Sequence, residues 1–401
     1  MKCKYNNFKL VITQKNYIND KSIGGNSSIH SIKTTKIINS NVKKLIKNLN
    51  YINKNMVIKI SNATSVISSM FSLSQIPEFV DYFYLDNNTF ENPSEILTLF
   101  KNYLNSLLTE SNEKQLSPIE FMQSLINENI INVDKEREPI KFLEKIFDYI
   151  NSELNGLDKE INNDLIKLTE QYNNIPKFLS YYNNHFLKAY NSIIGKKFYG
   201  IFQKKYLCDA CGEKIKYRKF NYIKLDKKLY SNYFIEKNLD NSFTDFYLED
   251  LIEFNFKNEN NKEKCVTCQK EVEVETKIIR FPDIIIFSIK WEDFDSEKGF
   301  KSENIWLDDN KLIFDEIIDL KNYSCFNDTG KKEYKIRSVI SYGIINQDNE
   351  NNKIWKKFIT FNRNIIDNNF YSCQPSASIY EIKTINRREF VPSVLFYESL
   401  K

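Results

Sequence analysis

Two stretches of the sequence contain the same motif, a pair of cysteines separated by two residues: KYLCDACGEK at residues 205–214 and KEKCVTCQKE at residues 262–271. Their Cys-x-x-Cys pairs are Cys208 with Cys211 and Cys265 with Cys268. Two thiolates at this spacing can reach one ion, and two such pairs complete the tetrahedral set of soft ligands that a structural zinc ion takes. Four cysteine ligands leave no open position on the metal, so the site would stabilise the fold and would not catalyse a reaction. The alternative is unmetallated or redox cysteines, although a redox motif would be single and near a βαβ pattern.

The surroundings of the cysteine pairs indicate how the chain is built around them. Gly212 follows the first pair directly, where a tight knuckle often needs a residue with positive φ. The gap between the pairs is wider than in a simple zinc ribbon, so we expect an inserted β-hairpin or a longer excursion there. Cys325 and Cys373 stand apart from the pairs and are expected to be ordinary thiols.

The composition narrows the class of protein. The chain has 401 residues, of which 41% are hydrophobic and 14% aromatic, which is enough apolar material for a sizeable core. The 57 Lys and Arg residues nearly balance the 53 Asp and Glu residues, so the net charge of +4 gives no reason to expect direct binding of nucleic acid or of a membrane surface. Residues 1–20 contain no long apolar run, so we expect no signal peptide and no membrane span. These features predict a cytoplasmic or nuclear protein, where disulfides are rare.

The chain divides into a helical part and a strand-rich part. Residues 1–55 are polar and are expected to form a leader. Residues 56–200 carry apolar side chains at helical spacing, for example Ile96 and Phe100. Beyond residue 200, short strand-like runs such as Ile284–Phe287 alternate with polar loops. Helices followed by strands predict the α+β class.

A series of short blocks follows one order along the chain. They are NATSVISSMFSLSQIPEFVDYF at 62–83, SPIEF at 117–121, EPIKFL at 138–143, FYG at 198–200, the two cysteine pairs, FPDIII at 281–286 with IK at 289–290, YKIRSVISYG at 334–343 and PSVLFY at 392–397. The series resembles the ubiquitin-specific proteases, the papain-like family of deubiquitinating enzymes. The resemblance implies one hand-shaped α+β domain at 56–399, with a helical thumb at 56–200, zinc-binding β fingers at 201–285 and an antiparallel β palm at 286–399.

The same resemblance implies where the nucleophile should be, and the residue there is of the wrong type. The family's cysteine falls on Thr64 or on Ser65, and its oxyanion asparagine falls on Lys59 or Ile60. A cysteine protease needs a thiolate to attack its substrate. A dyad of Ser65 with Lys357 is conceivable, but it would need a buried lysine of lowered pKa, which nothing in the sequence indicates.

The general base is missing as well. The family's histidine falls on or near Lys357, and the following Asp or Asn falls on or near Pro375 or Ser376. The chain has two histidines, His30 and His185, and neither lies in the palm segment. The resemblance therefore predicts a degenerate site without catalytic residues.

Four functions remain open. The first is an inactive member of the family that binds ubiquitin or a ubiquitinated protein as a scaffold, even though Trp291 replaces the arginine of the Leu-Lys-Arg-Phe motif and Arg137-Glu138 replaces Gln-Asp. The second is an inactive splicing factor of the tri-snRNP, in a larger protein or ribonucleoprotein complex, because residues 73–77 and 81–83 are similar to that branch. The third is an active thiol-dependent ubiquitin carboxyl-terminal hydrolase. The fourth is an unrelated zinc-containing binding protein.

Overall fold

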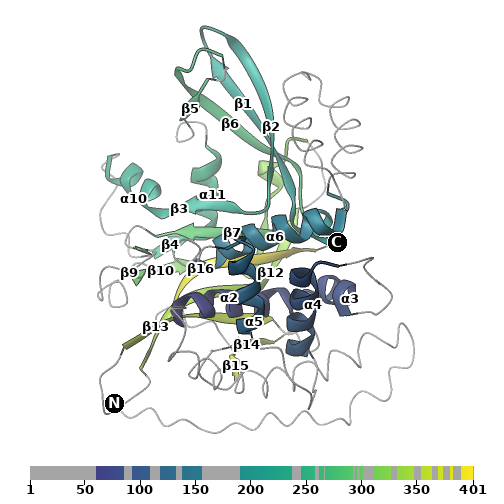
Figure 1. Ribbon diagram of the computed structural model, residues 1–401. Coiled ribbons are helices and arrows are strands. Elements are labelled where there is room, and N and C mark those ends of the chain that lie inside the picture. Colours follow the sequence, from purple (N-terminus) through teal and green to yellow (C-terminus); the bar gives the residue numbers. More distant parts are fainter. Residues whose placement is uncertain are drawn as a thin grey trace, which may run out of the picture.

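The computed structural model describes residues 60–84, 93–108, 118–131, 138–155, 190–236, 245–257, 262–265, 267–291, 294–295, 299–300, 311–326, 332–346, 354–363, 369–373, 380–382 and 390–400. Within these ranges most helices precede the strands in the chain, and the strands pair mainly antiparallel (Figure 1). The predicted α+β class is therefore confirmed. No helix among the described residues is long and apolar enough to cross a membrane.

The helical part packs through a continuous aromatic core. Its described helices are α2 (Ile60–Leu73), α3 (Pro77–Tyr84), α4 (Glu95–Leu108), α5 (Pro118–Asn127), α6 (Pro139–Asn155) and α9 (Ile193–Phe198). The rings of Phe79 and Phe83 on α3 both meet Phe100 on α4 at centroid distances of 6.2 and 5.2 Å, and Phe100 meets Phe121 on α5 at 5.8 Å. Such tilted and edge-to-face contacts are favourable geometries for buried rings. Ile96 and Phe100, which share the predicted apolar stripe, are at most 1% exposed.

The finger sheet is four-stranded and antiparallel, in the order β2-β1-β6-β5. Its strands are β1 (Gly200–Cys208), β2 (Gly212–Phe220), β5 (Lys262–Lys264) and β6 (Glu271–Arg280), and β1, β2 and β6 project from the body of the molecule (Figure 1). At the root of the sheet, a Cβ on Gly200 would lie 2.2 Å from the Phe220 ring and 2.8 Å from the Arg280 carbonyl oxygen. Only glycine allows the strands to approach this closely.

The palm sheet has eight strands, and seven of them follow the order β15-β14-β13-β12-β16-β7-β3, with β11 paired to β12. The strands are β3 (Ile223–Asp226), β7 (Ile284–Lys290), β11 (Ile317–Asp319), β12 (Glu333–Asn346), β13 (Ile354–Arg363), β14 (Phe370–Cys373), β15 (Tyr380–Ile382) and β16 (Phe390–Ser399). All pairs are antiparallel except β3 with β7. The sheet therefore joins β3, from the segment that the resemblance assigns to the fingers, to the palm strands.

The wide gap between the two cysteine pairs holds a long excursion, in agreement with the longer of the two expectations. After β2 and β3 the chain forms α10 (Lys227–Glu236), β4 (Asp245–Tyr247) and α11 (Leu248–Phe256), and then returns to the finger sheet at β5. β4 pairs in parallel with β10 (Lys311–Ile313). The remaining described elements are the pair β8 (Phe294–Asp295) and β9 (Gly299–Phe300) and the 3-10 helix at Lys321–Tyr323.

Helix α2 is the element that joins the helical part to the palm. It packs on β13 and β12 on one side and on α6 on the other. Its serines at positions 65, 68, 69 and 72 are all at most 1% exposed. Small side chains let the helix lie close to the sheet, and the Ser69 and Ser72 hydroxyls donate to the carbonyl oxygens four residues earlier.

One buried cation ties the thumb helices to the junction of the two sheets. Lys197 on α9 donates to the carboxylate of Glu78 on α3 and, at 2.7 Å, to that of Asp283 between β6 and β7. The lysine side chain is 11% exposed, whereas the side chains of Glu78 and Asp283 are 56% and 35% exposed. This ammonium group therefore adds a polar link between α3, α9 and the sheets to the aromatic packing of Phe79.

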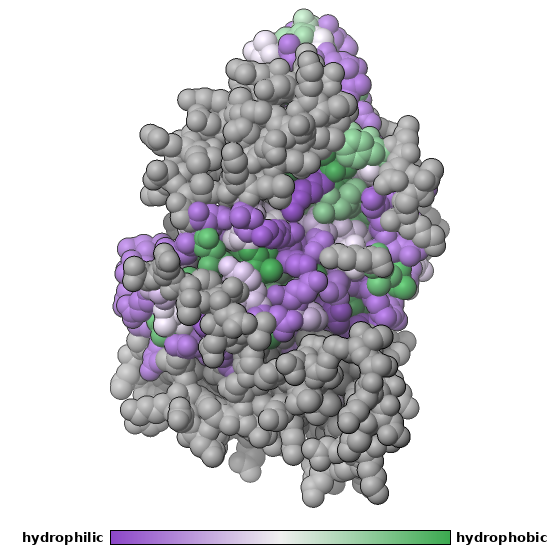
Figure 2. Space-filling view, turned by 90° about the vertical axis from the view of Figure 1, so that its right-hand side faces the viewer, coloured by the Kyte–Doolittle hydropathy of each residue, from purple (hydrophilic) through white to green (hydrophobic). Residues whose placement is uncertain are grey.

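The described surface is largely polar. On the face shown in Figure 2, hydrophilic residues form most of the coloured band and hydrophobic residues gather in smaller areas. The large apolar side chains that are exposed among the described residues are Leu229, Tyr247, Ile317, Phe326 and Leu400. Apolar residues scattered in this way are common on protein surfaces and do not mark a site.

Candidate functional site

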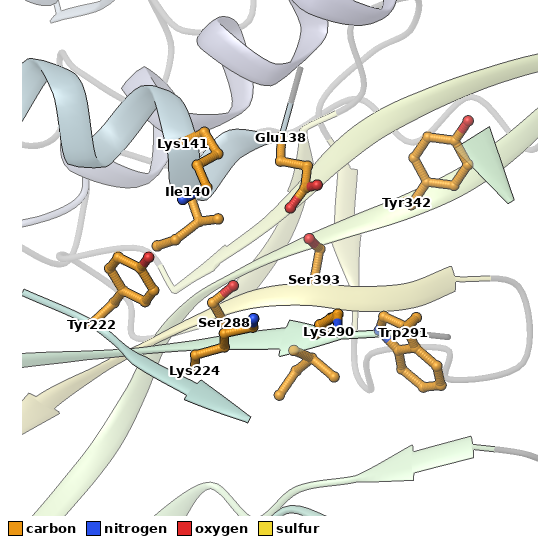
Figure 3. Close-up of a pocket in the computed structure, with 11 residues that line it drawn as sticks. Glu138, Ile140, Lys141, Tyr222, Lys224, Ser288, Lys290, Trp291, Tyr342 and Ser393 are labelled. Atoms are coloured by element: carbon orange, nitrogen blue, oxygen red, sulfur yellow. The ribbon is translucent and has the colours of Figure 1, made fainter. Parts of the chain in front are cut away.

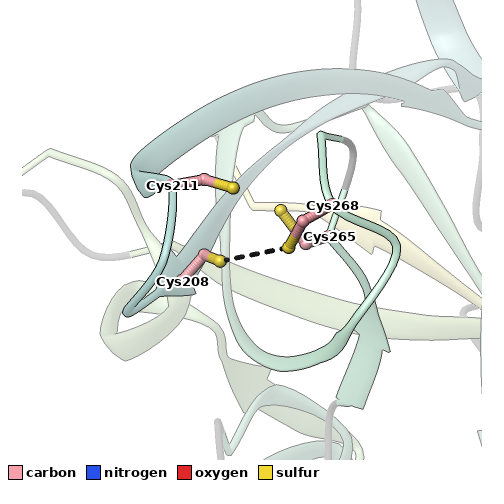
Figure 4. Close-up of side chains that lie close together, drawn as sticks. All are labelled: Cys208, Cys211, Cys265 and Cys268. Carbon is pink, nitrogen blue, oxygen red and sulfur yellow. Dashed lines mark hydrogen bonds between the residues drawn. The ribbon is translucent and has the colours of Figure 1, made fainter.

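The four cysteines of the two pairs come together at the tip of the finger sheet (Figure 4). Their sulfur atoms all lie within 4.8 Å of one another, and Cys208 Sγ is 3.6 Å from Cys268 Sγ. A tetrahedral zinc ion with Zn–S bonds of about 2.3 Å would hold its sulfur ligands about 3.8 Å apart. The residues present therefore fit a four-thiolate metal site, as the spacing predicts.

Both knuckles have the backbone geometry that the sequence indicates. Gly212 has φ of 71°, which confirms the expected positive φ, and Gln269 takes the corresponding conformation with φ of 60°. In the second knuckle, the N–H of Thr267 points to Cys265 Sγ at 3.5 Å. Backbone N–H groups of Cys268 and Thr267 lower the pKa of Cys265 to about 6, while hydrogen bonding to Cys268 raises the pKa of Cys211 to about 12. Without a metal the cluster therefore keeps part of its protons, which a dication would displace.

The two candidate nucleophile positions lie on α2 and are sealed from solvent. Thr64 and Ser65 are both 0% exposed. The backbone N–H of Phe358 on β13 donates to Thr64 Oγ1 at 3.4 Å, although the two residues are 294 positions apart. Ser65 Oγ is buried and has no hydrogen-bond partner among the described residues. This hydrogen bond places the start of α2 against β13. Lys357 directly precedes Phe358 in that strand.

The predicted partners of this position are only partly described. Lys357 lies in β13 opposite Gly343, and its side chain is outside the described structure. Ile60 begins α2. The remaining candidate positions and both histidines fall outside the described residues: Lys59, Pro375, Ser376, His30 and His185.

A buried polar network continues along the interface between α2 and the palm. Ser338 Oγ on β12 lies 2.8 Å from Ser72 Oγ on α2 and 2.5 Å from Asn362 Oδ1 on β13. Asn362 in turn donates to Thr360 Oγ1 at 3.3 Å. All four residues are at most 2% exposed. This network fixes α2 on the sheet and has no access for a substrate.

A polar pocket of about 270 Å³ opens between the start of α6 and the palm (Figure 3). Its lining comes from α6, β3, β7, β12 and β16: Glu138, Ile140, Lys141, Tyr222, Lys224, Ser288, Ile289, Lys290, Trp291, Tyr342 and Ser393. In Figure 3 the Glu138 carboxyl and the Ser393 hydroxyl point toward each other. The blocks at 138–143, 289–290, 334–343 and 392–397 already mark part of this lining, but the contribution of β3 carries no sequence signal.

Among the described residues, the Glu138 carboxyl group of the pocket has no cation within ion-pair distance. Burial raises the pKa of Glu138, although Lys141, Lys224 and Lys290 act in the opposite direction. Lys141 pairs with Glu144 at 3.1 Å, and Lys290 pairs with Asp226 at 2.9 Å. A half-buried carboxyl group opposite ammonium and hydroxyl groups can hold an extended segment that offers both donors and acceptors.

Two buried aromatic residues connect the pocket lining to the strand that contacts Thr64. Tyr342 lines the pocket and packs on Phe358 with ring centroids 5.1 Å apart. Tyr342 and Phe358 are 4% and 2% exposed, and the Phe358 N–H is the group that reaches Thr64. Thr64 is itself buried and does not belong to the lining of the pocket.

Comparisons with known proteins agree with this architecture. A family model described as ubiquitin carboxyl-terminal hydrolase matches residues 61–368. One similar solved structure is a SAGA DUB module of a substituted Ubp8 with Sgf11, Sus1 and Sgf73, with a TM-score of 0.57 and 15% identity over 86% of this chain and 69% of that chain. The yeast SAGA DUB module with an Sgf73 mutant gives a TM-score of 0.54 and 14% identity over 87% and 72%. The module bound to monoubiquitin gives 0.55 and 14% over 86% and 68%. No curated protein sequence matches significantly.

Proposed function

Because the chain belongs to the ubiquitin carboxyl-terminal hydrolase family, we propose that it is a degenerate member that binds ubiquitin or a ubiquitinated protein without cleaving it. The resemblance of the ordered blocks to the ubiquitin-specific proteases and the α+β hand fold that it implies are both confirmed. The chain therefore has the shape with which such proteins hold a polypeptide partner. The fold alone does not decide whether the chain cleaves its partner, because catalysis depends on the residues of the site.

The observation that carries the proposal is the composition and burial of the position where the family has its nucleophile. Thr64 and Ser65 have hydroxyls in place of a thiol, and both are 0% exposed. A neutral hydroxyl without an adjacent base is a weak nucleophile, and the sequence offers no histidine in the palm segment. Loss of triad members typically lowers the rate of such enzymes by several orders of magnitude.

The polar pocket between the start of α6 and the palm, which we call the thumb–palm pocket, supports a binding role. It is open to a partner, it lies between the two parts of the fold, and its polar groups converge from elements that are distant in the sequence. The structures of similar fold are DUB modules with several protein chains, one of them bound to monoubiquitin. By analogy, we place this chain in a larger protein assembly of the cytoplasm or nucleus.

The metal of the finger tip is proposed to be zinc. Its four thiolate ligands leave no site for a substrate, so the ion would hold the two knuckles together and supply no catalytic step. We propose the same division of the chain as above, into a leader at 1–55, a thumb at 56–200, fingers at 201–285 and a palm at 286–399, with β3 as the finger-segment strand that joins the palm sheet.

A cleavage assay tests the lack of catalysis. The purified chain is incubated with a ubiquitin–fluorophore substrate, and we expect no release of the fluorophore above buffer. Turnover that disappears in Thr64→Ala or Ser65→Ala would show that the proposal is wrong.

A titration with labelled ubiquitin tests the binding role. We expect saturable binding that Glu138→Lys weakens, because the substitution reverses the charge of the pocket at its half-buried carboxyl group. Glu153→Lys is the matched control, since it makes the same charge change on an exposed position of α6 away from the pocket. Absence of saturable binding at high micromolar concentration, or equal weakening by both variants, would refute the ubiquitin part of the proposal.

A further inference from the structure

Strand β2 carries a row of cations on one face of the finger sheet. Lys214, Lys216 and Arg218 occupy every second position, and side chains two apart in a strand lie on the same face. The register between β1 and β2 places Lys204 directly opposite Lys216. Lys214 and Arg218 are exposed, and Lys216 is half-buried. We call these four residues the cationic finger face.

The carboxylates of the sheet are distributed unevenly between its two faces. On the four described strands, Glu263 of β5 is the one carboxylate whose register position lies on the cationic finger face. It is already engaged, since it accepts hydrogen bonds from Lys204 and Tyr206 and lies 3.8 Å from Arg218. The other carboxylates lie on the opposite face, interspersed with lysines: Glu213, Glu271, Glu273 and Glu275.

Lys214 and Arg218 lie on β2, which is an edge strand of the finger sheet, and nearby carboxylates of the described residues offset only part of their charge. Lys214 has no carboxylate within ion-pair distance among the residues that the structure describes, and Arg218 lies 3.8 Å from Glu263, a carboxylate that it shares with Lys204. A net positive surface of this kind attracts an anionic partner and speeds its association. The strand repeat places alternate cations roughly 6.6–6.8 Å apart, which is also the spacing of alternate side chains in an extended polypeptide.

An acidic polypeptide matches this face better than a nucleic acid does. Proteins that bind single strands combine cations with exposed aromatic platforms on which bases stack. Here the aromatic residues of the same face are not available, because Tyr206 is 1% exposed and Phe202 stacks on Phe220 at a centroid distance of 4.0 Å.

We propose that the cationic finger face binds an acidic segment of a partner protein in extended conformation, with alternate carboxylates on Lys214, Lys216 and Arg218. This surface is separate from the thumb–palm pocket, and its residues line no part of that pocket. Substitutions in this face therefore leave the lining of that pocket unchanged, so the peptide test and the ubiquitin titration report on different residues.

The test uses the full chain and a labelled ten-residue peptide of alternating Glu and Thr. Fluorescence anisotropy should show binding that weakens with added salt. Charge reversal in K214E/K216E/R218E should weaken it by about tenfold or more, because three attractive charges of this face become repulsive. The matched control is K262E/K264E/K277E, which changes the charge equally on the opposite face of the same sheet. Metal content and circular dichroism confirm that both variants are folded.

The outcomes separate the proposal from its alternatives. Loss of peptide binding in the first variant alone, with no binding of an oligothymidine of similar length, supports it. No binding of the acidic peptide by the unmodified chain, equal loss in both variants, or displacement of the peptide by the oligothymidine would overturn it.

Discussion

Replacing Cys265 by serine should release the metal and unfold the finger tip while the palm stays folded. Cys265 is 0% exposed, its N–H donates to the Lys270 carbonyl at 2.7 Å, and its carbonyl accepts the N–H of Gln269 at 3.0 Å. The residue is thus both a metal ligand and the centre of the second knuckle. A serine hydroxyl stays protonated at neutral pH and is a poor zinc ligand, so the site would lose one of its four donors.

The size of the effect follows from what else holds the tip. Structural zinc supplies an apparent ~10–16 kcal/mol in isolated zinc fingers. Here β1 and β2 are also joined by a continuous register from Gly200 opposite Phe220 to Cys208 opposite Gly212. Part of the sheet should therefore survive without the metal, and we expect a local loss of about 3–5 kcal/mol. The loss should be confined to the knuckles at 205–214 and 262–271.

Metal analysis and amide hydrogen exchange measure the two parts of this prediction. We expect about one zinc per chain in the unmodified protein and close to none in Cys265→Ser. Exchange should accelerate in the knuckles and stay slow in β12 and β16. Cys325→Ser is the matched control, because that thiol donates to Gln203 Oε1 at 3.0 Å and lies outside the cluster. Unchanged zinc content in Cys265→Ser, or equal loss in Cys325→Ser, would refute the reasoning.

Three further substitutions test other features of the fold. Lys197→Met should destabilise the chain by about 1–2 kcal/mol in urea denaturation, because it leaves two partly exposed carboxylates without their cation; an unchanged midpoint would contradict this role. Gly200→Ala should cost about 1–3 kcal/mol, since the new methyl group would lie 2.2 Å from the Phe220 ring; tolerance of alanine would show that the strands can separate there. Glu138→Gln should stabilise the chain at neutral pH, and this advantage should shrink as the pH falls through the raised folded-state pKa of Glu138 and be gone near pH 4.5, because the folded state then holds the neutral form. A stability difference that grows on acidification would have the wrong sign.

Sequence patterns predicted correctly the features that depend on residues close together in the chain. The spacing of Cys208 and Cys211 predicts a knuckle, and Gly212 has the positive φ that such a knuckle needs. The apolar repeat around Ile96 and Phe100 predicts a helix with one buried face, and both side chains are buried. The register of i and i+2 positions in β2 is equally visible in the sequence, because a strand alternates its faces whatever it pairs with.

The sequence by itself thus predicted the four cysteines that cluster as a candidate metal site and the change from a helical to a strand-rich part of the chain. That other residues stand at the family's cysteine and histidine positions stays a prediction of the resemblance. Only the tertiary structure decided that Thr64 meets Phe358 across 294 residues, that both nucleophile candidates are fully buried, and that β3 leaves the fingers for the palm. The physical reason is the range of the forces. Spacing and propensity act within a few residues, whereas burial and pairing depend on how the whole core packs.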